Sequence, residues 1–303
     1  MAVVSSSVIL CTRNRITDVI TFLQSLTQQT QFPDQLIIID SSDRPIVELD
    51  IFSAIFNAAC FTQTQLLYKH TSPGLTYQRN VGISLATQEI IYFFDDDTIL
   101  ESDYLDQMNK IFAQYPEYAG GMGTVSNTPP QQDNIYRLVR NIVHAVFLLQ
   151  SNYASGTFKV SGIPTHAYGT HEFKRVEVLG GCCMAFRASI LAKHKFDEKL
   201  IGYAFMEDCD ISRRISYEFP LFYNPKARLK HNESPLARDR VIDNRAMYIK
   251  YYSYLFFKNF YSRNRFKIIA YCWSVMGLFL EALLMRNKDY LKGYCKGLKE
   301  YYF

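Results

Sequence analysis

Three consecutive carboxylates are the part of this sequence best able to do chemistry. Asp95, Asp96 and Asp97 directly follow an apolar run of strand length. Charges this close repel one another and lose solvation on burial, so something must stabilise them. If the backbone is extended here, Asp95 and Asp97 point to the same side and can share one divalent cation, Mg²⁺ or Mn²⁺. The alternative is an acidic helix start, because Thr98 and Glu101 have the spacing of a capping box.

Two further groups could complete such a site. Glu207 and Asp208 are adjacent carboxylates in the sequence MEDCD. A carboxylate whose pKa is raised by a charged neighbour can serve as a general base. The alternative is a solvated first helical turn in which Asp210 pairs with an arginine one turn later. His231 ends a strand-like run, and it becomes a metal ligand only if partners lie beside it.

Strand-like and helix-like segments alternate four times up to the acidic triplet. Strand-like segments that contain runs of Ile, Leu or Val occur at four places, residues 2–11, 35–40, 65–70 and 89–94. Such runs are typical of strands buried on both faces of a parallel sheet covered by helices. In that architecture ligands bind beyond the carboxyl ends of the strands. Those ends carry CTRNR, Asp40 and Asp95 here.

The second half of the sequence is less regular. The predicted elements are a loop at 120–132, a helix at 135–149, two strands joined by Gly180-Gly181, a helix opened by the MEDCD acids, and short strands ending at His231. Residues 151–173 are rich in Gly, Ser and Thr, which favours a loop or an exposed insertion.

The charge of the chain is unevenly distributed. Residues 244–303 hold 11 Lys and Arg against 3 Asp and Glu, and 17 of the 45 aromatic residues. With a net charge of +4 for the chain, this tail of +8 follows a body of −4. Within it, residues 268–284 are strongly apolar, but the run is short and Glu281 makes spanning costly. We expect an amphipathic helix in the plane of an anionic bilayer, the alternatives being helices that pack on the rest of the chain or form a dimer interface.

Cysteine usage and the N-terminus indicate the compartment. The seven cysteines form no CxxC pair, which favours a reducing environment over a disulfide framework. No basic region precedes the first apolar run, so a signal peptide is not expected.

Taken together, these pieces resemble glycosyltransferase family 2. The resemblance covers about residues 4–234, and the sequences that carry it are VSSSVILCTRNR, LIIIDSSD, SPGLTYQRNVGI, IIYFFDDDTIL, GGCCMAFRASIL, FMEDCDISRRI and a following His. It implies the α/β fold called GT-A, a mostly parallel central sheet flanked by helices, with a C-terminal helical extension. The implied domains are a catalytic domain at 1–235, with a nucleotide-sugar half at about 1–125 and an acceptor half at about 126–235, and a helical tail at 236–303.

The resemblance also implies a metal site and a catalytic base. Asp95 and Asp97 match the carboxylates of the family's DXD motif, which hold Mn²⁺ or Mg²⁺, and His231 matches a third ligand found in parts of the family. Asp208 matches the base that activates the acceptor hydroxyl, with Glu207 beside it.

A nucleotide-sugar site is implied as well. The residues that match it are Thr12, Arg13, Asp40, Arg79 and Asp96. Asp40 would contact the base, Arg79 the diphosphate and Asp96 the ribose. Arg13-Asn14 stands where many relatives have Tyr-Asn.

The activity implied is inverting transfer of one sugar from a UDP or dTDP sugar to a hydroxyl of a glycan or lipid-linked acceptor. The QxxRW motif of processive synthases is absent from the sequence. We expect a role in polysaccharide biosynthesis of the cell envelope, a cytoplasmic or peripheral membrane location on the cytoplasmic face, and no nucleic-acid partner, and leave a homo-oligomer open. A sugar-1-phosphate nucleotidyltransferase would show glycines after the first strand, and a non-catalytic binding protein would have lost a metal carboxylate or the base.

Overall fold

A computed structural model describes residues 4–49, 63–127, 135–149, 155–232, 240–262 and 264–302. The chain divides into two compact units. We call residues 1–128 and 168–233 the sheet unit, and residues 129–167 and 234–303 the helical unit. Residues 129–167, which the sequence analysis assigned to the acceptor half, belong to the helical unit in this division. The predicted domain boundary at residue 235 stays a prediction.

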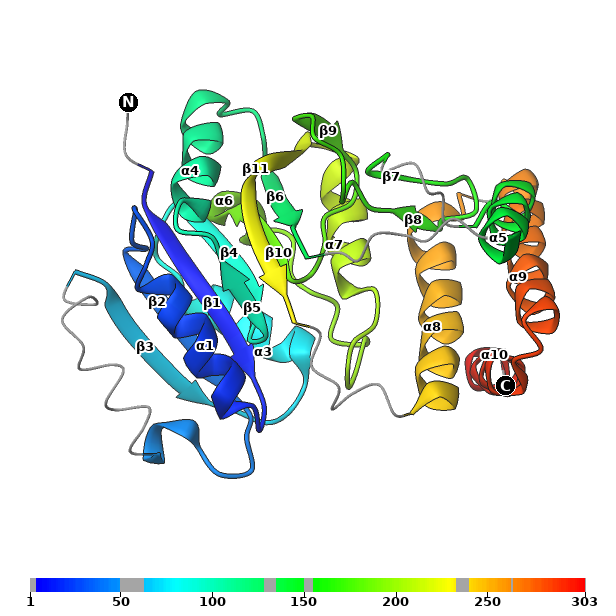
Figure 1. The fold of residues 1–303 in the computed structure, drawn as a ribbon, viewed down its shortest axis with the longest axis horizontal. Coiled ribbons are helices and arrows are strands. Elements are labelled where there is room, and N and C mark those ends of the chain that lie inside the picture. Colours follow the sequence, from blue (N-terminus) through cyan, green and yellow to red (C-terminus); the bar gives the residue numbers. More distant parts are fainter. Residues whose placement is uncertain are drawn as a thin grey trace. The chain divides into compact units, whose positions relative to one another are not determined.

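The sheet unit is built on a nine-stranded sheet in the described part of the chain (Figure 1). Its strands are β1 (Ser6–Thr12), β2 (Gln35–Asp40), β3 (Gln65–His70), β4 (Ile90–Asp95), β5 (Thr98–Leu100), β6 (Gly120–Val125), β9 (Lys174–Val176), β10 (Cys183–Arg187) and β11 (Leu221–His231). The order is β3-β2-β1-β4-β10-β6-β11-β5, and β9 also pairs with β11. The first four strands are parallel, whereas β10 is antiparallel to both of its neighbours. The α/β class is confirmed, and beyond β4 the sheet is mixed.

The parallel half follows the predicted apolar runs closely. All six residues of β2 are buried, as expected for a strand covered on both faces. In the register, Thr12 lies opposite Asp40, and Cys11 lies opposite Asp95. The carboxyl ends of β1, β2 and β4 therefore meet at one edge of the sheet.

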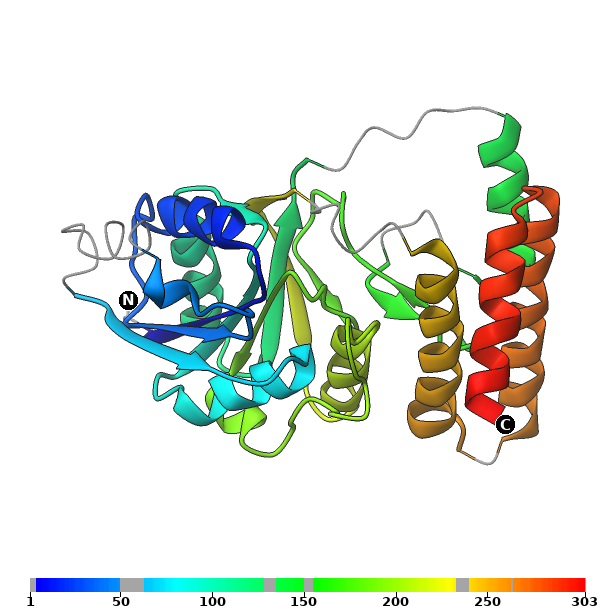
Figure 2. The same ribbon diagram turned by 90° about the horizontal axis from the view of Figure 1, so that it is seen from below.

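Five helices of the sheet unit are described, α1 (Ile16–Leu26), α3 (Leu75–Leu85), α4 (Tyr104–Gln114), α6 (Ala188–Leu191) and α7 (Glu207–Ser216). Helices α1 and α4 cover one face of the sheet, and α3 and α7 lie on the other (Figures 1 and 2). In α1 the apolar spacing buries Val19, Phe22 and Leu26 completely. Residues 46–59 have apolar residues at helical spacing in the sequence. Of these residues, Ile46–Glu48 forms a single 3₁₀ turn, and residues 50–59 lie outside the described residues.

The loop predicted from residue 120 was wrong at its start, because Gly120–Val125 is the buried strand β6. A side chain at Gly120 would overlap the ring of Phe186, and one at Gly121 would overlap Phe222. The glycines thus let large aromatic rings from neighbouring strands pack against the backbone, although glycine normally disfavours a strand. Short strands were also predicted near the end of this unit, but Leu221–His231 is one continuous strand.

The helical unit contains α5 (Ile135–Val146), α8 (Val241–Leu255), a π-helical turn (Phe256–Phe260), α9 (Arg265–Leu284) and α10 (Lys288–Tyr302), with the short strands β7 (Thr157–Phe158) and β8 (Pro164–Thr165). Helix α10 lies against α8, where Gly293 and Gly297 allow close approach to the backbone around Ala246 (Figure 2). The helix predicted at 135–149 is confirmed. Among the described helices, α9 is long and apolar enough to cross a bilayer, judged by length and composition alone. The six described cysteines are free.

Candidate active site

The acidic triplet lies in the turn between β4 and β5. Asp95 is the last residue of β4, and strand β5 begins at Thr98, whose hydroxyl donates to the Asp95 carbonyl at 2.8 Å. The alternative of a helix start at Thr98 is therefore wrong, since the next helix begins at Tyr104.

His231 is brought to the triplet by strand pairing. Strand β11 runs antiparallel to β5, with His231 opposite Thr98. Its Nε2 lies 3.0 Å from Oδ1 of Asp97 and 3.9 Å from Oδ2 of Asp95. One ligand atom from each of the three residues lies within 4.8 Å of the others. The structure thus brings together the three residues predicted to bind a metal.

Burial and charge govern protonation at this cluster. Burial raises the pKa of Asp95, against the opposing effect of Arg79 and His231. For His231, burial acts to lower the pKa, but the hydrogen bond with Asp97 and the neighbouring Cys182 and Asp95 together outweigh it, and the pKa is raised to about 11. Without a cation, the imidazolium supplies the positive charge that the carboxylates require. A divalent ion fits this donor set of two carboxylates and one imidazole once His231 releases its proton.

Asp96 faces away from this cluster. Its carboxylate accepts from the Thr12 hydroxyl at 2.7 Å and from Arg15 at 3.0 Å. Arg15 also lies 3.6 Å from Asp97, so it bridges the triplet and the first loop. Burial raises the pKa of Asp96 to about 7, although Thr12 and Arg15 act to lower it. Sequence reasoning missed Arg15. The signal was available, since a basic CTRNR loop and an acidic triplet follow adjacent parallel strands.

Arg13 and Asp40 occupy different environments in the first two loops. Arg13 is exposed and lies 3.4 Å from Asp43. Asp40 is fully buried at the end of β2, where its carboxylate accepts from the amides of Ser42 (2.8 Å) and Ile46 (2.9 Å) and from the hydroxyl of Tyr68 (2.8 Å). Asp40 therefore organises the loop that follows β2, beside Thr12.

Arg79 joins the acidic triplet to the second pair of carboxylates. It projects from α3 and is 2% exposed. Its guanidinium hydrogen-bonds to Glu207, to Asp95 at 3.2 Å and to the carbonyl of Gly181 at 3.0 Å. The ring of Phe196 packs against it, with 5.3 Å between the guanidinium carbon and the ring centroid. Arg79 was expected to contact the diphosphate of the donor. Its buried position between two carboxylates differs from that of an exposed arginine free to bind a diphosphate.

Glu207 and Asp208 begin α7, as predicted, but in different surroundings. Glu207 is buried, and burial together with repulsion from Asp208 raises its pKa to about 8, against the effect of Arg79. Asp208 is partly exposed, and one of its carboxylate oxygens accepts from the amide of Gly181 at 2.9 Å. The alternative of a solvated acidic turn is wrong for Glu207, whereas Asp210 does pair with Arg214 at 2.8 Å.

The loop that enters α7 is held in an unusual backbone conformation. Ala204 and Met206 have φ of 50° and 68°, a region that costs about 1–3 kcal/mol for residues other than glycine. Tyr203, in the same loop, is 57% exposed. Burial and the negative charges of Asp95 and Glu207 raise its pKa to about 12. Sequence reasoning missed Tyr203.

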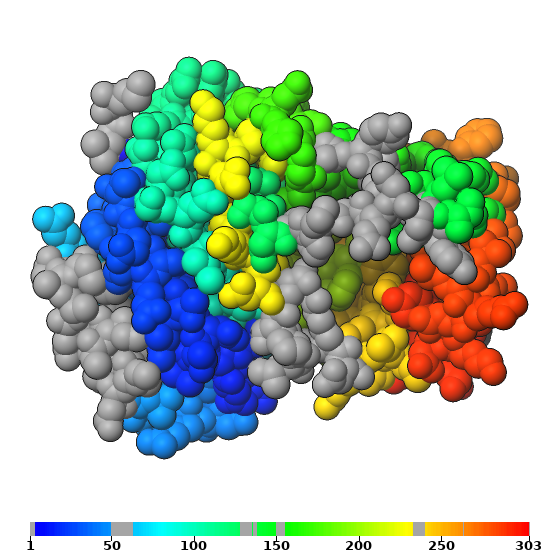
Figure 3. Space-filling model, viewed as in Figure 1, coloured from blue at the N-terminus to red at the C-terminus, as the bar shows by residue number. Residues whose placement is uncertain are grey.

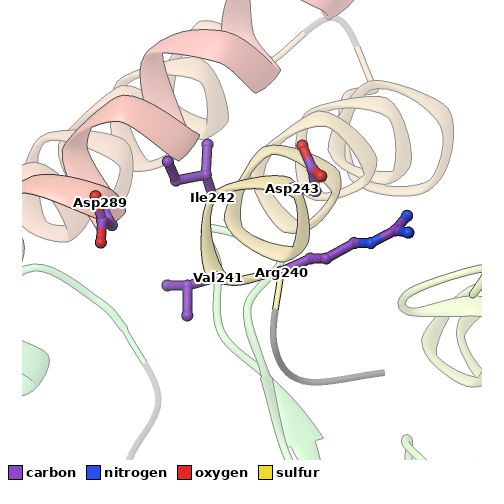
Figure 4. A pocket seen from close by; sticks show the side chains of 5 residues that line it. All are labelled: Arg240, Val241, Ile242, Asp243 and Asp289. Carbon is purple, nitrogen blue, oxygen red and sulfur yellow. The ribbon is translucent and has the colours of Figure 1, made fainter. Parts of the chain in front are cut away.

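A separate pocket lies in the helical unit, at the start of α8 (Figure 4). Its lining residues are Arg240, Val241, Ile242, Asp243 and Asp289. Asp243 pairs with Lys296 at 2.7 Å, and no predicted site residue lines this pocket. The carboxylate cluster in the sheet unit remains the candidate active site.

The family follows from comparison with known proteins. The family model described as Glycosyl transferase family 2 matches residues 7–194. The chain belongs to glycosyltransferase family 2. The matched residues include the acidic triplet and Arg79, while Glu207, Asp208 and His231 follow them. A search of curated proteins finds no match.

Solved structures share the fold at low sequence identity. S. aureus TarS 1–349 in complex with UDP-GlcNAc has a TM-score of 0.59 and 14% identity, over 98% of this chain and 80% of that one. GalNAc-T7 with UDP, GalNAc and Mn²⁺ has a TM-score of 0.58 and 14% identity, over 76% of this chain. The matches span 44% of the GalNAc-T7 chain and 54% of the longer TarS chain. The predicted GT-A fold is confirmed.

Proposed function

We propose that this family 2 enzyme transfers one sugar from a nucleotide-diphosphate sugar to a hydroxyl of a glycan or lipid-linked acceptor, with inversion and with Mn²⁺ or Mg²⁺ as cofactor. One observation carries the proposal. Asp95, Asp97 and His231 converge at the carboxyl end of β4, and Arg79 ties this cluster to the carboxylates that open α7.

The metal would be held by Asp95, Asp97 and His231. When bound, a divalent ion stabilises the negative charge that develops on a departing diphosphate. An imidazole among the ligands suits Mn²⁺ better than Mg²⁺. GalNAc-T7 was solved with Mn²⁺ and UDP, and TarS with UDP-GlcNAc, which supports Mn²⁺ and a UDP donor here, with dTDP as the alternative.

Asp208 is the stronger candidate for the base. Glu207 is buried and engaged by Arg79, whereas Asp208 is partly exposed and its orientation is fixed by the Gly181 amide. The acceptor hydroxyl would give its proton to Asp208 as its oxygen attacks the anomeric carbon. A single displacement inverts that carbon and requires no glycosyl-enzyme intermediate, unlike the two-step mechanism of retaining glycosidases.

The donor would lie along the carboxyl ends of β1, β2 and β4. Thr12 and Asp40 end neighbouring strands, and Asp96 links to Thr12. Exposed Arg13 and half-buried Arg15 provide positive charge for phosphate groups. Asp40 already holds three hydrogen bonds, so its role would be to shape the loop around the nucleobase. Tyr203 offers an aromatic surface for a sugar ring.

The enzyme would act in polysaccharide biosynthesis of the cell envelope, at the cytoplasmic face of a membrane.

Neither alternative activity, sugar-1-phosphate nucleotidyl transfer or non-catalytic binding, gains support from the site. The CTRNR loop of this chain lacks the glycines expected of a nucleotidyltransferase. A non-catalytic protein would have lost a metal carboxylate or the base, whereas Asp95, Asp97 and Asp208 are all present.

Nucleotide release tests the proposal. A panel of sugar nucleotides is incubated with Mn²⁺ and candidate acceptors, and free nucleoside diphosphate is measured. At least one donor should turn over, and Asp208→Asn should keep nucleotide binding while losing about 10²–10⁴-fold in rate. The matched control Asp106→Asn changes an acid on the outer side of α4 that pairs with Lys110, and it should behave as wild type. Normal turnover by Asp208→Asn would refute the assignment of the base.

A further inference from the structure

Helix α5 carries an exposed apolar stripe in the helical unit. The stripe consists of Ile135, Leu138, Val139, Ile142 and Val146, which are 42–66% exposed. Their spacing puts all five on one side of the helix. This helix lies outside the C-terminal tail in which a membrane-binding segment was predicted.

Helix α9 carries a second stripe. Its members are Phe266, Ile269, Trp273, Met276, Leu283 and Leu284, which are 40–80% exposed. The other side of α9 packs inside the unit through Tyr271, Leu278 and Ala282. The exposed residues are therefore additional to those that hold the unit together.

The two stripes meet at Trp273. Its indole donates to the carbonyl of Val146 at 2.8 Å, and its ring stacks on Phe147 with centroids 4.7 Å apart. The helices lie side by side, with α5 in green beside the orange and red C-terminal helices in Figure 3. We call the residues of both stripes the α5–α9 face.

Glu281 does not interrupt this face. Its carboxylate lies 3.0 Å from His144 and 3.5 Å from Arg140, and its side chain is 17% exposed. Arg140 offsets the charge of Glu281 and His144 hydrogen-bonds to it, so the charge of Glu281 does not add to the cost of burying the exposed stripe.

Positive charge lies at both ends of α9. Arg265 and Lys267 stand at its start, and Arg286 and Lys288 follow its end. Lys and Arg beside an apolar stripe favour an anionic bilayer surface, where their heads reach lipid phosphates and their stems lie along the acyl boundary. A second copy of this face would bring like charges together, which costs energy.

We propose that the α5–α9 face binds in the plane of an anionic bilayer, with Trp273 at the interface. The inference rests on the proposed function only in that it would bring a lipid-linked acceptor to the enzyme. Helix α9 would lie on the bilayer rather than cross it, because its inner side is used in packing against its own unit.

Vesicle flotation with the full chain tests this proposal. The wild type should float with phosphatidylglycerol-containing vesicles and much less with pure phosphatidylcholine. Emission of Trp273, the single tryptophan of the chain, should shift to shorter wavelength on binding. In about 1 M NaCl, where the Debye length is about 3 Å, binding should weaken. A carbonate wash at high pH should release the protein.

A double variant tests whether the α5–α9 face is what binds the vesicles, and a single variant outside the face is its control. The double variant Ile142→Glu with Ile269→Glu should lower partitioning at least about tenfold, since each change removes an apolar side chain from the bilayer contact and adds a negative charge. Tyr217→Glu, at a residue 59% exposed just after the end of α7 in the sheet unit, should bind as wild type. Nucleotide release in solution should be equal in all three proteins, so failure of the proposed activity is distinguished from failure of membrane binding. Any of four results would overturn the proposal. These are a wild type that does not float with anionic vesicles, unchanged flotation of the double variant, insertion that resists the carbonate wash, and a wild-type dimer that the double variant dissociates.

Discussion

The buried contact between Arg79 and Glu207 allows a quantitative test of how the site is held together. Arg79→Gln keeps a polar side chain but removes the charge that Glu207 and Asp95 share. Removing one partner of a buried ion pair costs about 3–5 kcal/mol. We expect a loss of about 3 kcal/mol at neutral pH, at the lower end of that range. The reason is that Glu207, whose pKa is raised to about 8, can neutralise itself by taking a proton.

A double-mutant cycle isolates the pair. Glu207→Gln in the Arg79→Gln background removes the unpaired carboxylate, so the two losses should be non-additive by at least about 1 kcal/mol. Arg228→Gln is the matched control, because Arg228 pairs with Glu101 at 3.0 Å while both side chains are 40% or more exposed. Exposed pairs contribute about 0–1 kcal/mol, so this control should change little.

Urea unfolding followed by far-UV circular dichroism measures these effects. The only tryptophan, Trp273, lies in the helical unit, so its fluorescence reports the unfolding of that unit. A transition seen by circular dichroism but not by Trp273 fluorescence is then assigned to the sheet unit. If Arg79→Gln changed the sheet-unit transition no more than Arg228→Gln does, and the cycle were additive, Arg79 would not be the connection between the carboxylate groups.

Two other predictions follow from the same geometry. In wild type, the stability contributed by protonated Glu207 is present below its ordinary pKa of 4.5 and is lost as pH rises through about 8. The stability of Glu207→Gln relative to wild type should therefore rise between pH 4.5 and 8, and equal pH profiles in urea unfolding would contradict the raised pKa. Gly121→Ala should overlap the ring of Phe222 in β6 and destabilise the sheet unit by about 1–3 kcal/mol in the same assay, whereas an unchanged midpoint would mean that β6 packs less tightly.

The sequence predicted the parallel half of the fold well because its signals are local. Strand β2 is an apolar run and β3 is a short strand-like segment, and the observed limits of both coincide with the predicted ones. Strand β6 escaped prediction because three glycines read locally as a loop. Their role depends on Phe186, Phe222 and Tyr104, which are distant in sequence. The grouping of α5 with α9 likewise depends on long-range contacts such as His144 with Glu281.

The positions of the candidate site residues depend partly on local sequence signals and partly on long-range pairing. Asp95 ends a strand and Asp97 lies two residues later, so their convergence could be inferred, although Asp96 and Asp97 form a turn and not extended backbone. The place of His231 beside them depends on the pairing of β11 with β5, which no local pattern shows. The sequence motif also did not reveal that Arg79 points inward between Asp95 and Glu207.

The metal position tests the account most directly. Crystals grown with UDP and Mn²⁺ can be measured at a wavelength where manganese scatters anomalously. We predict a manganese peak bounded by the carboxylates of Asp95 and Asp97 and the Nε2 of His231, next to the diphosphate. A bound nucleotide with the manganese peak elsewhere, or with no peak at saturating Mn²⁺, would contradict the proposed mechanism.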